Sequence, residues 1–162
     1  NDFVLNLQHN SVILDIGCGT GRNLNYSNVN IIGVDISFEQ LRHCTKNTIQ
    51  TTMSNLPFKN DTFDFILSIA SFHHLNKIDD RIKCLEEMSR VLVSGGKILL
   101  SVWSINQPAK TKRKFTKYGD TFVYWRDIPR YYYIFEISEI ILCHENMCAS
   151  FIGIYSYNLV TV

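Results

Sequence analysis

Three glycines and an acid stand together near the N-terminus in a pattern typical of ligand-binding turns. Residues 15–21 read Asp-Ile-Gly-Cys-Gly-Thr-Gly and directly follow the apolar run 12–14, which predicts a strand that ends in a glycine-rich turn. Glycine lets the backbone take positive φ and approach a ligand with no Cβ in the way. Here the glycines stand at every second position, unlike the G-x-G-x-x-G pattern that cradles a dinucleotide pyrophosphate.

A second acid, Asp35, ends the next apolar run, at residues 31–34. A carboxylate at the end of a second strand can accept two hydrogen bonds from a ribose diol. Together, the glycine turn and Asp35 resemble the S-adenosylmethionine site of class I methyltransferases. The resemblance implies that S-adenosylmethionine is the cofactor. It assigns the methionine part of the cofactor to Asp15, Gly17, Gly19 and Gly21, and the ribose and adenine edge to Asp35 and Ile36.

The same resemblance assigns the rest of the cofactor pocket. Met53 and Ser54 are expected to flank the adenine, and Ile69 is expected to line the pocket. The family usually has an acid after the third strand, where a carboxylate accepts a hydrogen bond from the adenine amino group. Thr52 stands there in this chain, and its hydroxyl can accept the same bond more weakly, or the Met53 backbone can take over this role.

Composition describes an ordinary globular protein. The chain has 162 residues, 46% of them apolar and 19% charged, with a net charge of +1, so a core can form and no strong electrostatic bias exists. No apolar run is long enough to span a bilayer, so we expect no membrane association. The five cysteines include no C-x-x-C pair, which favours reduced thiols in an intracellular protein. Cys143 and His144 would point in different directions on a helix, which argues against a metal site.

Strand and helix signals alternate, which predicts a mostly parallel sheet flanked by helices. The expected strands and helices, in chain order, are strand 12–16, a short helix 20–27, strand 31–35, a helix from the cap Ser37 to about Lys46, strand 49–53, strand 63–70, a helix that begins at Asp79 and ends at Gly95–Gly96, and strand 97–103.

After Trp103 the periodicity stops. Residues 104–129 are polar, basic and rich in aromatics, and we interpret them as a loop on the substrate side. A helix is expected over 138–146, followed by two strands, 150–154 and 157–162, joined by a short turn. We therefore expect residues 1–162 to form one domain with a seven-stranded sheet whose last strand is antiparallel. Because the chain begins in what resembles the end of a helix, we also expect the N-terminus to be truncated.

Two further segments match class I methyltransferases. Residues 55–64 resemble the segment that leads into the family's fourth strand, and residues 90–97 resemble its helix end and fifth-strand entry. A narrower resemblance, to the eukaryotic wobble-uridine tRNA methyltransferases, rests on residues 68–74, on Trp103 with Gln107, and on residues 120–125 and 130–133. That resemblance implies methylation of a carboxymethyl group on the wobble uridine of tRNA, with a small zinc-binding activator subunit as partner. It also favours a location in the cytoplasm, with the nucleus as an additional site.

Three residues are candidates for contact with the acceptor. His73 and His74 follow the fourth strand, where an α/β sheet presents its ligand crevice, but either one could instead bond a loop carbonyl. Arg130 could hold a carboxylate or phosphate through its guanidinium fork, or form a surface ion pair with Glu136 or Asp127. A carboxylate acceptor has a pKa near ~4 and is already ionised at neutral pH, so this chemistry requires no general base.

RNA contact has its own candidates. Tyr124, Trp125 and Tyr131 could stack on unpaired bases, or pack under a loop. The basic residues Lys112, Arg113 and Lys114 could follow a phosphate backbone, or form a solvated linker. Two alternatives to the tRNA enzyme stay open. One is a class I methyltransferase for a small metabolite, and the other is a methyltransferase-fold scaffold without activity.

Overall fold

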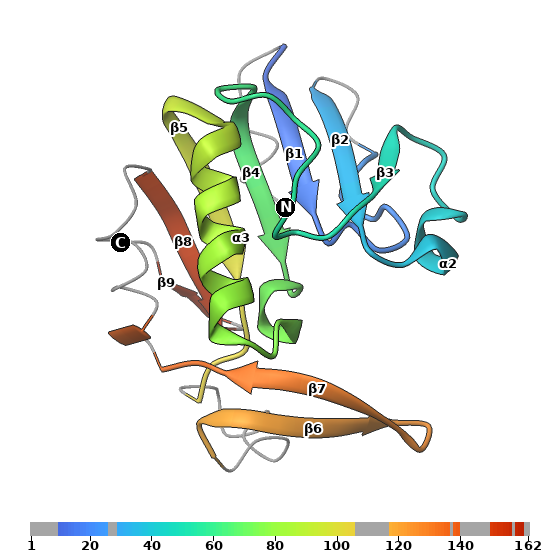
Figure 1. Ribbon diagram of the computed structural model, residues 1–162, viewed down its shortest axis with the longest axis vertical. Coiled ribbons are helices and arrows are strands. Elements are labelled where there is room, and N and C mark those ends of the chain that lie inside the picture. Colours follow the sequence, from blue (N-terminus) through green and yellow to red (C-terminus); the bar gives the residue numbers. More distant parts are fainter. Residues whose placement is uncertain are drawn as a thin grey trace.

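Figure 1 shows the computed structural model, which describes residues 10–25, 29–105, 117–136, 138–139, 150–156 and 158–160. Its main feature is a seven-stranded sheet with the order β3-β2-β1-β4-β5-β8-β9. The strands are β1 (Val12–Ile16), β2 (Asn30–Asp35), β3 (Thr48–Gln50), β4 (Phe63–Ile69), β5 (Leu92–Ser101), β8 (Ser150–Ser156) and β9 (Asn158–Val160). All neighbours are parallel except β8 and β9, which are antiparallel. The predicted α/β fold is confirmed.

Strand order brings the predicted site residues to one edge. β1 lies inside the sheet and pairs with β2 on one side and β4 on the other. The chain therefore adds β2 and β3 in one direction from β1 and the strands from β4 onward in the opposite direction. Loops that leave the carboxyl ends of such strands diverge and leave a crevice. The glycine turn, Asp35 and the segment after β4 all follow these three strands.

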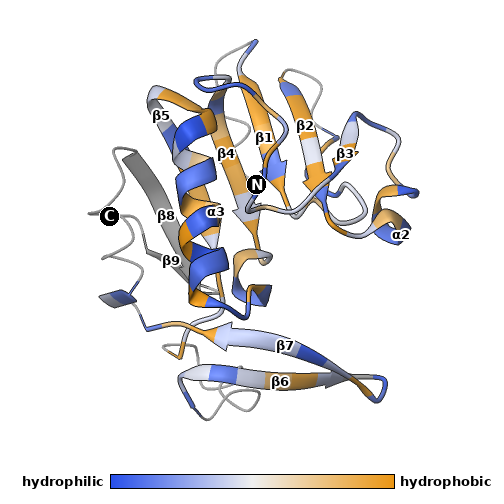
Figure 2. Ribbon diagram, in the orientation of Figure 1, coloured by the Kyte–Doolittle hydropathy of each residue, from blue (hydrophilic) through white to orange (hydrophobic). Residues whose placement is uncertain are grey.

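The core occupies both faces of the sheet because side chains alternate along each strand. On one face Leu14 and Ile66 pack with Met88 of helix α3 (Ile78–Val91), and all three are fully buried. On the other face Ile13, Leu67 and Leu99 form a second apolar cluster. The central strands are accordingly apolar along most of their length, as Figure 2 shows.

A β-hairpin replaces part of the predicted loop 104–129. β6 (Gly119–Trp125) pairs with β7 (Ile128–Ile134) across a two-residue turn at Arg126 and Asp127, which have φ of 48° and 66°. In Figure 1 the hairpin lies across the end of the sheet to which the arrowheads of β1 and β4 point. Phe135 fixes its base, since its N–H donates to the Trp103 carbonyl (2.9 Å). Residues 106–116 lie outside the described residues.

The predicted helices were less accurate. Turns occupy residues 19–23 where a helix was expected, so that prediction is wrong over the described part of 20–27. The helix capped by Ser37 is only α2 (Phe38–Leu41), and its Phe38 is 60% exposed. Helix α3 ends at Val91 rather than at the glycine pair, because β5 begins at once with Leu92. The expected helix 138–146 lies almost entirely outside the described residues. None of the described helices is long and apolar enough to cross a membrane.

Candidate cofactor and substrate site

The end of β2 holds the glycine turn by its backbone. The N–H groups of Gly17 and Cys18 both donate to the Val34 carbonyl, at 2.8 and 3.0 Å. The next residue of the turn is held by a side chain, because the Gly19 N–H donates to Oδ2 of Asp35 (2.9 Å). Asp35 therefore shapes the turn besides facing the crevice.

Gly17 is the position where the turn cannot carry a side chain. Its φ is +74°, and a Cβ there would lie 2.2 Å from the Cβ of Ser71. Ser71 is fixed in turn, since its hydroxyl donates to the Ile16 carbonyl (2.8 Å) and accepts a hydrogen bond from Ser68 (2.9 Å). At Gly19, by contrast, a Cβ would meet nothing within 4 Å. The turn thus approaches the β4 exit closely at one glycine and leaves open space at the other.

A cavity of about 370 Å³ opens at this edge of the sheet. Six predicted cofactor residues line it: Gly17, Asp35, Ile36, Thr52, Met53 and Ser54. The remaining lining residues are Ile16, Val34, Thr51, Ser71, His74, Leu75 and Asp80. Sequence reasoning missed Ser71 and Asp80. The position of Ser71 close after the predicted fourth strand is the sequence signal that could have found it, whereas Asp80 simply falls in the first turn of the helix predicted to begin at Asp79.

Asp15 has an unusual environment for a carboxylate. It is 1% exposed, and neither of its oxygens has a hydrogen-bond partner among the described residues. Burial raises the pKa of Asp15 from 3.8 to about 7; a contact with the Asn23 side chain, which is outside hydrogen-bonding geometry and leaves both oxygens unsatisfied, lowers it, and the charge of Asp35 adds a smaller increase. An unpaired buried carboxylate fits a cationic donor, such as the ammonium group of the methionine part of S-adenosylmethionine.

Asp35 is placed to accept further hydrogen bonds. Its Oδ1 accepts from the Ser37 N–H and its Oδ2 from the Gly19 N–H, both at 2.9 Å. Each carboxylate oxygen can accept two bonds, so both retain a lone pair for a diol at the cavity wall. The carboxylate is thus oriented by the backbone before any ligand binds.

The segment after β3 forms another wall of the cavity, which Gly17 and Asp35 also line. The Thr51 N–H donates to the Asp35 carbonyl (3.0 Å), and the Asn55 N–H donates to the Thr52 carbonyl (3.2 Å), which closes a turn over residues 52–55. Thr52 is exposed, and its hydroxyl oxygen accepts a bond from the Ser54 hydroxyl (3.4 Å). The Thr52 hydroxyl therefore remains at the cavity surface, where the predicted adenine contact requires it.

The two histidines have different environments. His73 is 1% exposed, and its Nδ1 accepts a hydrogen bond from the Trp103 N–H (3.3 Å). Its ring stacks with Tyr132 at 5.2 Å between centroids, and burial lowers its pKa to about 3, with His74 adding to the effect. The expected contact between His73 and the acceptor is therefore not supported; the imidazole is a neutral packing group that joins η1 (Phe72–His74) to β7.

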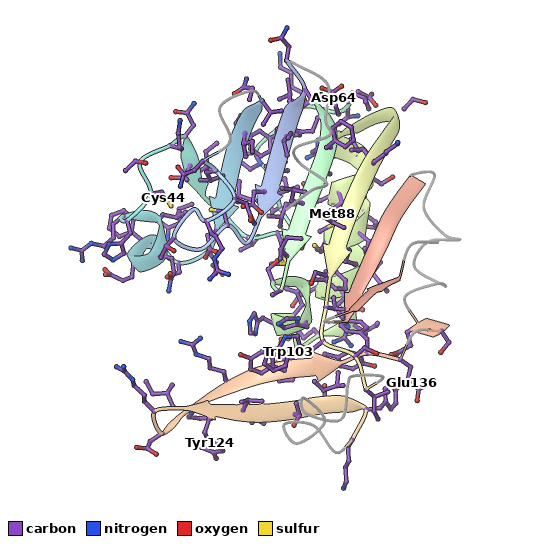
Figure 3. All side chains as sticks on the ribbon, turned by 180° about the vertical axis from the view of Figure 1, so that it is seen from behind. Cys44, Asp64, Met88, Trp103, Tyr124 and Glu136 are labelled. Carbon is purple, nitrogen blue, oxygen red and sulfur yellow. The ribbon has the colours of Figure 1, made fainter. Side chains whose placement is uncertain are left out.

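His74 lines the cavity and also bonds a loop carbonyl. Its Nδ1 donates to the backbone oxygen of Tyr131 (2.9 Å), because a carbonyl can only accept. Tyr132, the next residue, stacks on Trp103 with ring planes 8° apart and centroids 4.3 Å apart. Figure 3 shows Trp103 between η1 and the hairpin. These contacts attach the hairpin to the wall of the cavity.

Several predicted site residues are not part of the cavity lining, among them Asp15, Gly19, Gly21, Ile69 and Arg130. Ile69 packs into the apolar cluster of Ile13 and Leu67, so its predicted role as pocket lining is not supported. At Gly21, with φ of +81°, a Cβ would lie 3.0 Å from the Cys44 Sγ, so this glycine serves packing of the turn. Arg130 is exposed on β7, and strand alternation places it on the same face as Tyr132.

Among the predicted RNA-binding aromatics whose side chains the structure describes, Tyr124 is the most accessible, at 70% exposed, and it points away from the sheet in Figure 3. The Tyr131 hydroxyl donates to Asp120 (2.5 Å), and its ring meets that of Phe122, which is 61% exposed. Trp125 belongs to β6, but its side chain lies outside the described residues, as do Lys112, Arg113 and Lys114.

Comparison with known proteins gives a consistent result. The family described as "Methyltransferase domain" matches residues 14–100. A methyltransferase of Encephalitozoon cuniculi (strain GB-M1) is 33% identical over 149 residues, which cover 84% of this chain and 69% of that protein. The tRNA (carboxymethyluridine(34)-5-O)-methyltransferase of Schizosaccharomyces pombe is 34% identical over 128 residues, covering 76% and 56%. The chain spans only about a quarter of the length of its human, mouse and bovine relatives.

Solved structures support the fold. A SAM-dependent methyltransferase from Methanosarcina mazei superposes with a TM-score of 0.77 at 22% identity, covering 91% of this chain and 82% of that one. A second match belongs to a complex between the Haloferax volcanii Trm112 methyltransferase activator and a methyltransferase (TM-score 0.51, 23% identity, 56% and 44% covered). With the family match over more than half of its length, the chain belongs to the methyltransferase domain family, as a class I S-adenosylmethionine-dependent methyltransferase.

Proposed function

We propose that this chain methylates the carboxymethyl group of the wobble uridine of tRNA, in the cytoplasm or the nucleus. The fission yeast relative described above is named for that reaction. The observation that carries the proposal is the β6–β7 hairpin. It presents exposed aromatic rings and Arg130, and the His74–Tyr131 hydrogen bond joins it to the wall of the cofactor cavity. An aromatic and cationic surface beside a cofactor site suits a nucleic-acid acceptor.

In this proposal, the cofactor is held by the cavity residues together with Asp15 of β1 and Gly19 of the glycine turn. Asp15 takes the ammonium group, and the open space at Gly19 allows the methionine part to approach the backbone. Asp35 accepts the ribose hydroxyls, and Ile36 meets the edge of the adenine. The Thr52 hydroxyl accepts the adenine amino group, with Met53 and Ser54 beside the ring.

When bound, S-adenosylmethionine supplies a methyl group on a positively charged sulfur. A carboxylate acceptor arrives already ionised, so the protein has no proton to remove. Its task is to align the acceptor with the methyl group and exclude water, and such positioning is worth on the order of 7–11 kcal/mol. This agrees with the position of His73, which is buried outside the cavity lining and whose pKa of about 3 makes it a poor base.

Arg130 is our candidate for the acceptor carboxylate or a neighbouring phosphate, through its planar fork of donors. His74, which lines the cavity, is our second candidate for contact with the acceptor. Tyr124, Trp125 and Tyr131 are candidates for stacking with unpaired bases, each base being worth about 1–3 kcal/mol in such sites. Lys112, Arg113 and Lys114 are candidates for contact with the phosphate backbone.

A small zinc-binding activator subunit is the proposed partner. The Haloferax volcanii complex supports this for a protein of the same fold. In this chain, β3 is the last strand on its side of the sheet, with exposed Ile49, and the neighbouring Ile36 and Phe38 are 68% and 60% exposed. Exposed apolar side chains around a sheet edge are a typical place for a partner to bind.

A methyl-transfer assay with labelled S-adenosylmethionine tests the proposal. The acceptor is tRNA from cells that lack the modification, with and without the co-expressed activator. We expect label in the wobble uridine, which Asp35→Ala abolishes because the cofactor site is lost. Arg130→Ala should keep cofactor binding and lose transfer. Cofactor binding without transfer to any tRNA would refute the tRNA substrate and favour a small acceptor, and no cofactor binding would favour the scaffold.

A further inference from the structure

Two thiols contact one backbone oxygen of the glycine turn. The Cys44 Sγ lies 3.4 Å from the carbonyl oxygen of Gly19, and the Cys18 Sγ lies 3.9 Å from the same atom. Because both Sγ atoms contact the same oxygen atom, the two thiols are neighbours in the folded chain. Both cysteines are free. The pair is therefore a dithiol that a single small ligand can reach with both sulfurs.

Each sulfur packs closely against a glycine. A Cβ at Gly33 would lie 2.7 Å from the Cys18 Sγ, and one at Gly21 would lie 3.0 Å from the Cys44 Sγ. Cys18 is buried, whereas Cys44 is half-buried and gives access from solvent beside α2 (Figure 3). A ligand would enter at Cys44 and close onto Cys18.

The chemistry of single thiols is unfavourable here. Burial, with smaller contributions from the charges of Asp15 and Asp35, raises the pKa of Cys18 to about 12, and burial also raises the pKa of Cys44. Oxidation and alkylation need the thiolate, so both reactions are slow at neutral pH. A reagent that bonds to both sulfurs and displaces both thiol protons does not depend on a preformed thiolate. Its affinity is raised by chelation, because the second bond forms after the reagent is already attached to the protein.

We propose that Cys18 and Cys44 form a binding site for trivalent arsenicals of the monosubstituted arsenoxide class, and that occupation of this site weakens cofactor binding. In the reaction the arsenic–oxygen double bond breaks and two arsenic–sulfur bonds form. Both thiol protons leave with the oxygen as one molecule of water. Arsenic stays trivalent, so no oxidant or reductant takes part.

Coupling to the cofactor follows from Gly19. Its carbonyl contacts both sulfurs, while its N–H donates to Asp35 at the cavity wall. Drawing the sulfurs together around arsenic removes their contacts with the carbonyl and shifts this peptide, which stands at φ of +56°. Because coupling between two sites is reciprocal, bound S-adenosylmethionine should weaken arsenical binding by the same factor.

Phenylarsine oxide is the probe, used with a background variant in which Cys143 and Cys148, outside the described residues, are serine. Intact mass should show one arsenic per chain with the loss of one water, and two titratable thiols should disappear. Calorimetry should then show the dissociation constant of S-adenosylmethionine raised at least about tenfold, with a coupling of about 1.4 kcal/mol. Excess dimercaptopropanol, a competing dithiol, should remove the arsenical and return the dissociation constant of S-adenosylmethionine to its original value.

Cys44→Ser is the decisive variant, because Cys44 is half-buried and the substitution should leave the fold intact, as circular dichroism can verify. It should weaken arsenical binding about a hundredfold through loss of chelation. Cys84→Ala, which removes a buried thiol away from the turn, is the matched control and should leave arsenical binding unchanged. Equal affinity in the Cys44→Ser variant, an adduct that leaves both thiols titratable, or an adduct with full cofactor affinity would overturn the proposal. If Cys84→Ala fails to fold, peptide mapping of the adduct in the protein with Cys84 intact replaces this control. Arsenic should then be found on Cys18 and Cys44 and not on Cys84.

Discussion

Replacing Asp15 by Asn should stabilise the cofactor-free protein above neutral pH. The folded pKa of Asp15 is about 7 against 3.8 in a solvated chain, so the folded state holds a proton that the unfolded state has lost. Stability contributed by this group is therefore full below about pH 4 and is lost as pH rises to about 7. At 1.36 kcal/mol per pH unit, the gap corresponds to about 4 kcal/mol at pH values above 7. Asn is nearly isosteric and carries no charge.

Urea unfolding of both proteins at about pH 4.5 and about pH 8 measures this effect. The variant should exceed wild type by about 1 kcal/mol at the lower pH and by about 4 kcal/mol at the higher. The same variant should bind S-adenosylmethionine about 10–100-fold more weakly, since a hydrogen bond to a charged group is worth about 1.5–3 kcal/mol. Equal stability of the two proteins at the higher pH would show that the Asp15 carboxylate is paired or hydrated, and would refute the reasoning.

Three further predictions follow from contacts described above. Gly17→Ala should destabilise the protein by about 2–4 kcal/mol more than Gly19→Ala in urea unfolding, because both glycines have positive φ but only the first meets Ser71; equal losses would contradict the close approach. Tyr132→Ala should cost about 3–5 kcal/mol and reduce the near-ultraviolet circular dichroism, and an unchanged spectrum would argue against the ring stack. Phe38→Ser should raise solubility, abolish co-purification with the activator and leave cofactor affinity unchanged; retained co-purification would place the partner elsewhere.

Local patterns were enough to predict the central sheet and six of the residues that line the cavity. The apolar runs that became β1, β2 and β4 are continuous because these strands are covered on both faces, and the glycines and Asp35 follow them at fixed offsets. Residues that meet only through the sheet order could not be predicted in this way. Ser71 contacts Gly17 because β4 lies beside β1, and nothing in the local sequence of either residue indicates that.

The hairpin was missed for an identifiable reason. Its two-residue turn has positive φ at both positions, a conformation that Asn-Gly or Asp-Gly normally signals, but this chain has Arg126 and Asp127 there. The buried state of His73 was likewise unpredictable, since its partners Trp103 and Tyr132 come from β5's exit and β7. For α2, Ser37 was correctly predicted as a cap, whereas the length of the helix was overestimated.

The stack of Trp103 on Tyr132 gives the chain an optical reporter. The sequence contains two tryptophans, so a Trp125→Phe variant would leave Trp103 as the only indole. Its ring lies between a cofactor-side segment and the hairpin, against the rings of Tyr132 and His73. Emission from this indole therefore reports directly whether the hairpin is seated or lifted. Stopped-flow fluorescence would test, without an attached dye, whether the hairpin moves during a catalytic cycle.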